Sequence, residues 1–311
     1  MSRTFIFMLL ILLPLTSRSQ TVEVEGIVYE IDVASGEAKV VNVTSHDLVE
    51  YSIQEAVEYG GKRYPVTAIG YRAFYYLNYA TSITIPNSVV TIEDEAFSLC
   101  FNFTSIILSN SLKSIGRRAF YSCFGLTSLS LPESLESIGV EAFGGCYKLE
   151  SLTIPRNVVN IGIPIFNYSG RKLSSIEVSP DNPKYDSRGG CNALIETGTN
   201  TLLAGCCNTV VPNTVTAIGK YAFTGLQDLK SLSLPNSVTK IEDCAFSSTS
   251  YLTDVRFSDS LTFIGNYAFS HSMLKAIKLP NSLRHIGDYA FYYNGCWNVV
   301  NMAKAPLTLP K

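Results

Sequence analysis

Residues 126–146 read LTSLSLPESLESIGVEAFGGC, and this stretch decides the fold. Leu126, Leu129 and Leu131, with Ser128 and Ser130 between them, are typical of a short strand with one buried face. Pro132 ends that strand because proline has no N–H for the ladder, and Gly139 permits a tight bend. Residues 140–146 predict a short helical turn that directs Phe143 toward the interior.

The same unit recurs along most of the chain. Its marker is a phenylalanine, preceded by alanine in eight cases and by isoleucine in one, at intervals of 23 residues apart from one of 57 and one of 22. A fixed interval of 20–29 residues is typical of leucine-rich repeats. The phenylalanines are Phe74, Phe97, Phe120, Phe143, Phe166, Phe223, Phe246, Phe269 and Phe291.

Stacking is the physical consequence of this repeat. A single unit has two apolar edges, and only neighbouring units can bury both in one continuous core. The sequence therefore predicts an α/β leucine-rich repeat solenoid of about nine 23-residue units. Short parallel strands are expected on one face and short helical turns on the other, with the phenylalanines as a structural spine.

These motifs resemble the BspA-like subfamily of bacterial leucine-rich repeat proteins. The resemblance rests on the pattern LxxLxLPxSLxxIGxxAFxxC at residues 126–146 and, less closely, at 149–166, and it covers about residues 20–305. It implies export, a cell-surface or secreted location, and binding to host proteins or to other cells.

The ends of the chain have their own patterns. Residues 1–19 are typical of a secretory signal peptide, with Arg3, an apolar run over 5–15 and a small-x-small site at Ser17–Ser19; an uncleaved anchor is the alternative. Residues 20–66 lack the Ala-Phe unit, and their alternation and turn residues predict a β-rich N-terminal cap. We therefore expect a secreted, cell-surface or periplasmic protein without a transmembrane span.

The solenoid is expected over residues 67–311, and the 57-residue interval contains an insertion at about 179–209. Residues 193–196 and 201–204 flank a Thr-Gly-Thr-Asn turn and predict a β-hairpin there. The insertion is either purely structural or an added ligand contact, because binding residues concentrate in loops.

Several classes of function find no support in the composition. Lysine plus arginine number 24 against 26 acidic residues, so the net charge of −2 argues against a nucleic-acid partner. His46, His271 and His285 are scattered, and no hydrolase or phosphate-binding motif is present. We expect no enzyme, cofactor, metal or small-molecule ligand. The acidic clusters at 93–95 and 242–243 are interpreted as caps of helix N-termini.

The eight cysteines fall into two groups of interest. Cys100, Cys123 and Cys146 share one column of the repeat, where parallel side chains about 4.8 Å apart favour buried free thiols over disulfides. A bridge from Cys191 to Cys206 or Cys207 remains open, and zinc is disfavoured because no CxxC pair or nearby histidine pair is present.

The expected binding surface is the solvent side of the strands, because alternate strand residues point outward. It is either a solvated β surface or a broad docking surface of the kind that solenoids provide. Its expected members are Ser82, Thr84, Ser105, Ser128, Ser130, Ser151, Thr153, Ser231, Ser233, Asp254, Arg256 and Lys278.

Tyrosines also cluster in the first and last units, at 71–79 and 289–293, where covering the ends of the stack is favoured over a binding hot spot. The sequence thus predicts an exported protein that binds other proteins, through adhesion to host extracellular matrix or to other cells. The alternative is an envelope scaffold with no host ligand.

Overall fold

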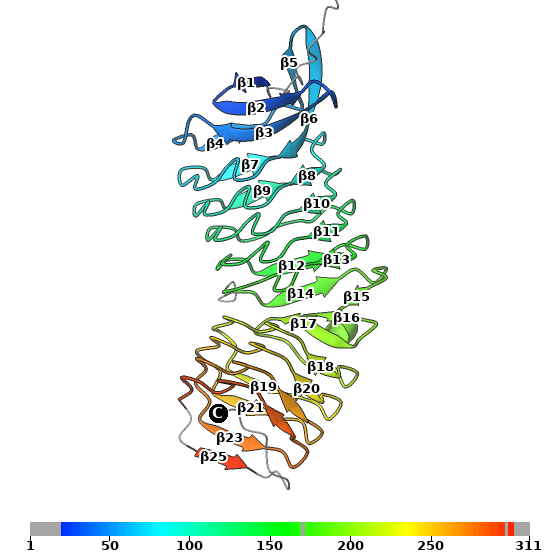
Figure 1. Cartoon of the computed structure of the whole chain (residues 1–311), viewed down its shortest axis with the longest axis vertical. Coiled ribbons are helices and arrows are strands. Elements are labelled where there is room, and N and C mark those ends of the chain that lie inside the picture. Colours follow the sequence, from blue (N-terminus) through cyan, green and yellow to red (C-terminus); the bar gives the residue numbers. More distant parts are fainter. Residues whose placement is uncertain (1–19, 169–171, 296–297, 302–311) are drawn as a thin grey trace, which may run out of the picture.

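The computed structural model describes residues 20–168, 172–295 and 298–301. The expected signal peptide at 1–19 and the terminal residues 302–311 lie outside this part of the chain. The described residues form an elongated stack of coils, with the N-terminal strands at one end and the last coils at the other (Figure 1). No helix among them is long and apolar enough to cross a bilayer.

A first ladder of short parallel strands runs along one side of the stack (Figure 1). The three-residue strands, such as β9, β19 and β21, bury their central residue and direct the flanking residues outward, as the alternation predicts. The ladder consists of β4 (Glu50–Ser52), β7 (Ser82–Thr84), β9 (Ser105–Ile107), β12 (Ser151–Ile154), β14 (Ser175–Val178), β19 (Ser231–Ser233), β21 (Asp254–Arg256), β23 (Ala276–Leu279) and β25 (Asn298–Asn301). The expected strand at 126–131 is absent, since those residues carry no strand pairing in the structure.

A second ladder, which the sequence did not predict, lies on another side of each coil (Figure 1). It is built from two-residue strands that pair in parallel with the equivalent residues one coil away. Its members are β8 (Thr91–Ile92), β10 (Ser114–Ile115), β11 (Ser137–Ile138), β13 (Asn160–Ile161), β18 (Ala217–Ile218), β20 (Lys240–Ile241), β22 (Phe263–Ile264) and β24 (His285–Ile286).

The Ala-Phe segments are turns rather than the expected helical turns. Arg118, with φ 54°, and Ser122, with φ 58°, both take the left-handed backbone conformation, which a helix cannot contain. The N–H of Phe120 donates to the carbonyl of Ala142 in the next coil at 2.9 Å, instead of to its own coil. The solenoid is therefore a β-solenoid of about nine turns and not α/β, and the described residues contain one helix, the 3-10 turn η1 (Arg188–Gly190).

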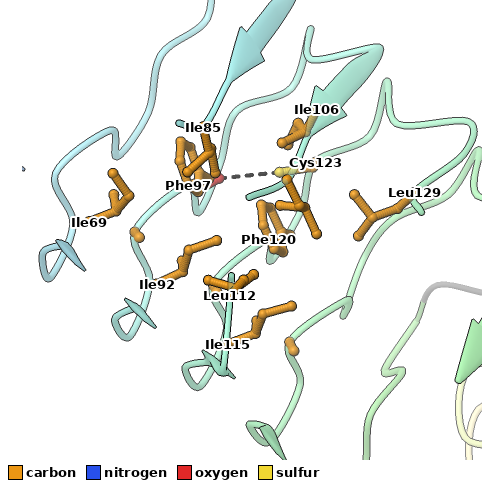
Figure 2. Close-up of a cluster of buried hydrophobic side chains, with 14 of the residues drawn as sticks. Ile69, Ile85, Ile92, Phe97, Ile106, Leu112, Ile115, Phe120, Cys123 and Leu129 are labelled. Carbon is orange, nitrogen blue, oxygen red and sulfur yellow. Dashed lines mark hydrogen bonds between the residues drawn. The ribbon is translucent and has the colours of Figure 1, made fainter. Parts of the chain in front are cut away.

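The phenylalanines form the predicted spine (Figure 2). Phe120 is fully buried, and its ring stacks at 5.4 Å on Phe97 and at 6.0 Å on Phe143, with interplanar angles of 4° and 6°. The thiol of Cys123 donates to the carbonyl of Phe97 at 3.2 Å, which Figure 2 shows as a dashed line. Because each thiol of this column bonds a phenylalanine carbonyl, Cys100, Cys123 and Cys146 are buried free thiols, as the spacing predicts.

A glycine column holds the coils close together. A Cβ added to Gly139 would fall 2.5 Å from the carbonyl carbon of Gly116 in the preceding coil. The φ of Gly139 lies outside the left-handed region, so close backbone approach, and not a tight bend, explains this glycine.

The acidic residues beside this column do not cap helices, because no helix follows them. Instead, the Asp94 carboxylate accepts the N–H of Arg117 at 2.7 Å in the next coil, and the Asp243 carboxylate accepts that of Asn266 at 2.8 Å. These carboxylates thus satisfy backbone donors of the neighbouring coil.

Residues 20–69 form the N-terminal end of the stack. β3 pairs in parallel with β6, and β6 with β8, so these strands continue the second ladder. The strands are β1 (Gln20–Val24), β2 (Ile27–Asp32), β3 (Glu37–Val43), β5 (Ala56–Tyr59) and β6 (Lys62–Ile69).

The second ladder is interrupted between β13 and the strands that follow it, β15 (Tyr185–Asp186), β16 (Ala193–Glu196) and β17 (Thr201–Gly205). β16 and β17 form an antiparallel hairpin, and β17 then pairs in parallel with β18. Side chains bridge the interruption: the amide of Asn182 donates to the carbonyl of Val158 at 2.9 Å. The buried side chains accordingly fall into two clusters, which meet at this hairpin.

Asp186 and Arg188 hold the segment before the hairpin. The guanidinium of Arg188 donates to both carboxylate oxygens of Asp186, at 2.7 and 2.6 Å, and to the side chain of Asn200 at 2.7 Å. Burial alone would raise the pKa of Asp186, but these bonds and that from Thr197 outweigh it and hold the pKa below its usual range.

Candidate functional site

The solvent side of the first ladder is a row of small polar side chains, which we call the serine face. It comprises the outward-facing residues of β7, β9, β12, β14, β19, β21 and β23, with Ser128 and Ser130 between β9 and β12. Parallel pairing places like residues beside one another: Ser82 lies opposite Ser105, and Ser151 opposite Ser175. Within each set of paired strands, the hydroxyl groups are therefore held in register.

Nearly all the residues expected on this face are exposed. Ser82 is half-buried. The exposed residues are Thr84, Ser105, Ser128, Ser130, Ser151, Thr153, Ser231, Ser233, Asp254, Arg256 and Lys278.

The serine face is divided into sections. Four separate sheets carry it, namely β4-β7-β9, β12-β14, β19-β21 and β23-β25, and the insertion lies between the second and the third. In the third sheet, Ser231 pairs with Asp254 and Ser233 with Arg256. The structure therefore brings the expected residues together as neighbours within each section.

Two features of the face were missed from the list of expected site residues. One is Ile107 of β9, whose side chain is 63% exposed on the face and whose outward position follows from the same alternation. The other is a hollow at the ends of β19 and β21, which Ser233 and Arg256 share with Val210, 70% exposed, and Asp259. Val210 lies 23 residues before Ser233, which in turn lies 23 residues before Arg256, so the repeat itself indicates its outward position.

The chemistry of the serine face is that of hydrogen bonding. Hydroxyl groups both donate and accept, and the face is mostly neutral in its first half, where Glu177 is its charged member, while Asp254, Arg256 and Lys278 add charge in its second. Among the described residues, no three histidine, cysteine or acidic side chains gather as a metal site would require. His271 and His285 lie in successive coils, where they stack on Tyr293 at 5.2 Å and on Phe263 at 4.6 Å.

Comparisons with known proteins agree with this architecture. The sequence model of the BspA type leucine rich repeat region matches residues 67–187 and 204–307 in six copies. No curated protein matches the chain. A leucine-rich repeat protein from Bacteroides ovatus is 29% identical with a TM-score of 0.60, and the match covers 86% of this chain and 61% of that protein. The chain thus spans about three-fifths of that relative.

Two further solved structures share the fold. A leucine rich cell surface protein from Faecalibacterium prausnitzii is 24% identical with a TM-score of 0.54, over 92% of this chain and 95% of that one. The pneumococcal vaccine antigen PcpA is 22% identical with a TM-score of 0.66, over 91% and 85%. Together with the repeat pattern and the stacked coils, the family match establishes that the chain belongs to the BspA-type leucine-rich repeat proteins.

Proposed function

We propose that this protein is exported to the cell surface or secreted, and that it binds other proteins through the serine face. The observation that carries the proposal is the exposed row of hydroxyl groups, held in register by the first ladder. Small side chains on strands lose little conformational freedom on binding, so little of the contact energy is offset by ordering. Family membership supports a protein partner.

The finer proposal is adhesion to host extracellular matrix or to other cells. It rests on the signal-peptide pattern of residues 1–19 and on the resemblance to the BspA-like family. The fold is shared with a protein described as a leucine rich cell surface protein, which is consistent with display outside the cell. In this proposal residues 20–66 are a β-rich cap that covers the first coil of the solenoid at 67–311.

Binding of the purified protein to immobilised fibronectin, fibrinogen, laminin and collagen tests the proposal. Producer-cell envelope serves as a parallel surface. We expect saturable binding to at least one matrix protein. Binding to the envelope alone would favour the alternative, an envelope scaffold, and binding to neither would overturn the adhesion proposal for these ligands.

Charge introduced on the face locates the contact. Ser128→Lys combined with Ser151→Lys places two bulky cations at neighbouring positions of the row. We expect at least a tenfold loss of affinity, because the partner surface would no longer be complementary to the face in shape or charge. The matched control is Ser35→Lys combined with Thr239→Lys, which makes the same charge change at two exposed hydroxyl residues away from the face. Equal binding by both double variants would place the contact elsewhere.

A further inference from the structure

The turn side of the last coils carries two parallel columns of residues that include stacked aromatic rings, and one coil between rings of the first column has no aromatic residue in either column. The columns occupy the residue before each Ala-Phe and the second residue after it. From coil to coil the first column reads Tyr221, Cys244, Tyr267 and Tyr289, and the second reads Gly225, Ser248, His271 and Tyr293.

Backbone bonds fix the order of these coils. The N–H of Tyr221 donates to Asp243, and that of Cys244 donates to Asn266, so Cys244 lies one coil after Tyr221 and one before Tyr267. The coil of Cys244 and Ser248 has a small residue in both columns, and it forms the floor of a hollow.

Aromatic rings bound this hollow on the C-terminal side. The ring of Tyr267 stacks on Tyr289 of the following coil at 5.1 Å, and His271 stacks on Tyr293 at 5.2 Å. The opposite faces of the Tyr267 and His271 rings lie toward the coil of Cys244, which has no aromatic ring in either column. Tyr267 remains 41% exposed.

Tyr168 bounds the hollow on the N-terminal side. It is seated on Gly225, where an added Cβ would fall 2.8 Å from both its Cα and its ring carbon Cδ1. Its hydroxyl lies 3.5 Å from the Oγ of Ser248, and the ring is 45% exposed. Gly225 therefore makes room for an aromatic wall that the column itself lacks at that coil.

The lining is neutral and rich in hydroxyl groups. Ser247 and Ser270 contribute hydroxyls that bond each other at 2.9 Å, and no carboxylate, lysine or arginine lines the hollow. Open ring faces beside hydroxyl donors and acceptors suit a ligand that has both apolar C–H faces and many hydroxyls. A pyranose ring has this combination, whereas a proline or phenylalanine side chain has only the apolar part.

We propose that this hollow binds a neutral carbohydrate, with a sugar ring packed against Tyr267 and His271 and its hydroxyls bonded to Ser248 and Tyr168. The site lies on the turn side of the solenoid, so it is separate from the serine face and does not depend on the function proposed for that face.

Saturation-transfer NMR on the purified protein tests the site. The probes are the methyl glycosides of glucose, galactose, mannose and N-acetylglucosamine, at millimolar concentration. We expect saturable transfer to at least one of them. Tyr267→Ala removes one stacking surface from an exposed position and should weaken binding about 3-fold or more.

Filling the hollow is the sharper variant. Cys244→Tyr inserts the residue that already occupies this column one coil before and one coil after, so the fold accepts it while the gap closes. We expect binding to be abolished with the thermal midpoint unchanged. The control is Tyr251→Ala, at a tyrosine of the same coil that is 60% exposed and outside the hollow.

Three results would overturn the proposal. The first is that none of the four glycosides binds saturably. The second is that a folded Cys244→Tyr variant binds as well as the unmodified protein. The third is that Tyr251→Ala loses as much binding as Tyr267→Ala. Capture of a proline-rich peptide at Tyr267 in place of the glycosides would identify the hollow as a peptide site and would equally refute a carbohydrate ligand.

Discussion

Replacing Gly139 by alanine sets two physical effects of opposite sign against each other. Alanine restricts the unfolded chain, which stabilises a protein by about 0.4–1 kcal/mol wherever the native backbone accepts it. The φ of Gly139 is acceptable for alanine, so backbone conformation alone predicts a more stable protein. The neighbouring coil predicts the reverse, because the new Cβ would lie 2.5 Å from the carbonyl carbon of Gly116.

The magnitude follows from the distance. Ordinary contact begins near 3.4 Å, so the two coils would have to separate by about 0.9 Å at a point where backbone meets backbone. Forcing extra atoms into a packed interior costs about 1–3 kcal/mol. Subtracting the gain from the unfolded chain leaves a net loss between about 0 and about 2.6 kcal/mol for Gly139→Ala.

Urea unfolding followed by far-ultraviolet circular dichroism measures this loss as a lower midpoint. The matched control is Gly198→Ala, since Gly198 has no atom within 4 Å of its added Cβ and should be neutral or slightly stabilised. If Gly139→Ala proved as stable as Gly198→Ala, close approach between coils would not be the reason for the glycine column.

Three further outcomes are expected. Phe120→Ala removes a fully buried ring stacked on both sides and should lower the free energy of unfolding by about 3–5 kcal/mol in urea, and a loss below about 1 kcal/mol would contradict the spine. Asp186 has a folded-state pKa below its unfolded value, so the stability it contributes is present above about pH 3.9 and is lost as the pH falls through the folded pKa. Asp186→Asn should therefore cost about 1–3 kcal/mol at pH 7, by loss of the bidentate bond to Arg188, and the difference from the unmodified protein should shrink toward pH 3. Burial raises the pKa of Cys146 to about 12, so iodoacetamide at pH 8 should alkylate the half-buried Cys244 before Cys146. Mass spectrometry measures both rates, and modification of Cys146 at the same rate as Cys244 would refute its burial.

The sequence predicted those parts of the fold that depend on which side chains are buried. The 23-residue interval between phenylalanines located the spine because a stacked core needs one large apolar residue at the same place in every coil. Alternation likewise placed Ser105, Ser151 and Thr153 on the solvent side, where the structure has them.

Features set by the backbone between coils were not visible in the sequence. The second ladder contributes only two residues per coil, such as Ser137 and Ile138, and two residues are too few to show a period. The Ala-Phe turns place Glu141 and its equivalents at positive φ, although these residues are not the glycine or asparagine that usually signals that conformation. Their N–H groups bond the next coil, and this pairing between coils excludes the helical turn.

The division of the serine face into sections was also not predicted from the sequence. The repeat shows which residues face outward in each unit, but the break after β14 depends on how the insertion displaces the next coil. The hollow beside Val210 lies at the same place, where Val210 occupies the repeat position of Ser233 and Arg256.

The pairing of each coil with only its neighbours has a mechanical consequence. Tension applied to the two ends would load the outermost coil first, because the bonds that hold it lie between it and one neighbour. Each released coil of 23 residues would lengthen the chain by about 80 Å, and unwinding would proceed in equal steps. The hairpin of β16 and β17, where the two buried clusters meet, would interrupt that series. Under load, this protein would behave as an extensible tether that dissipates energy coil by coil.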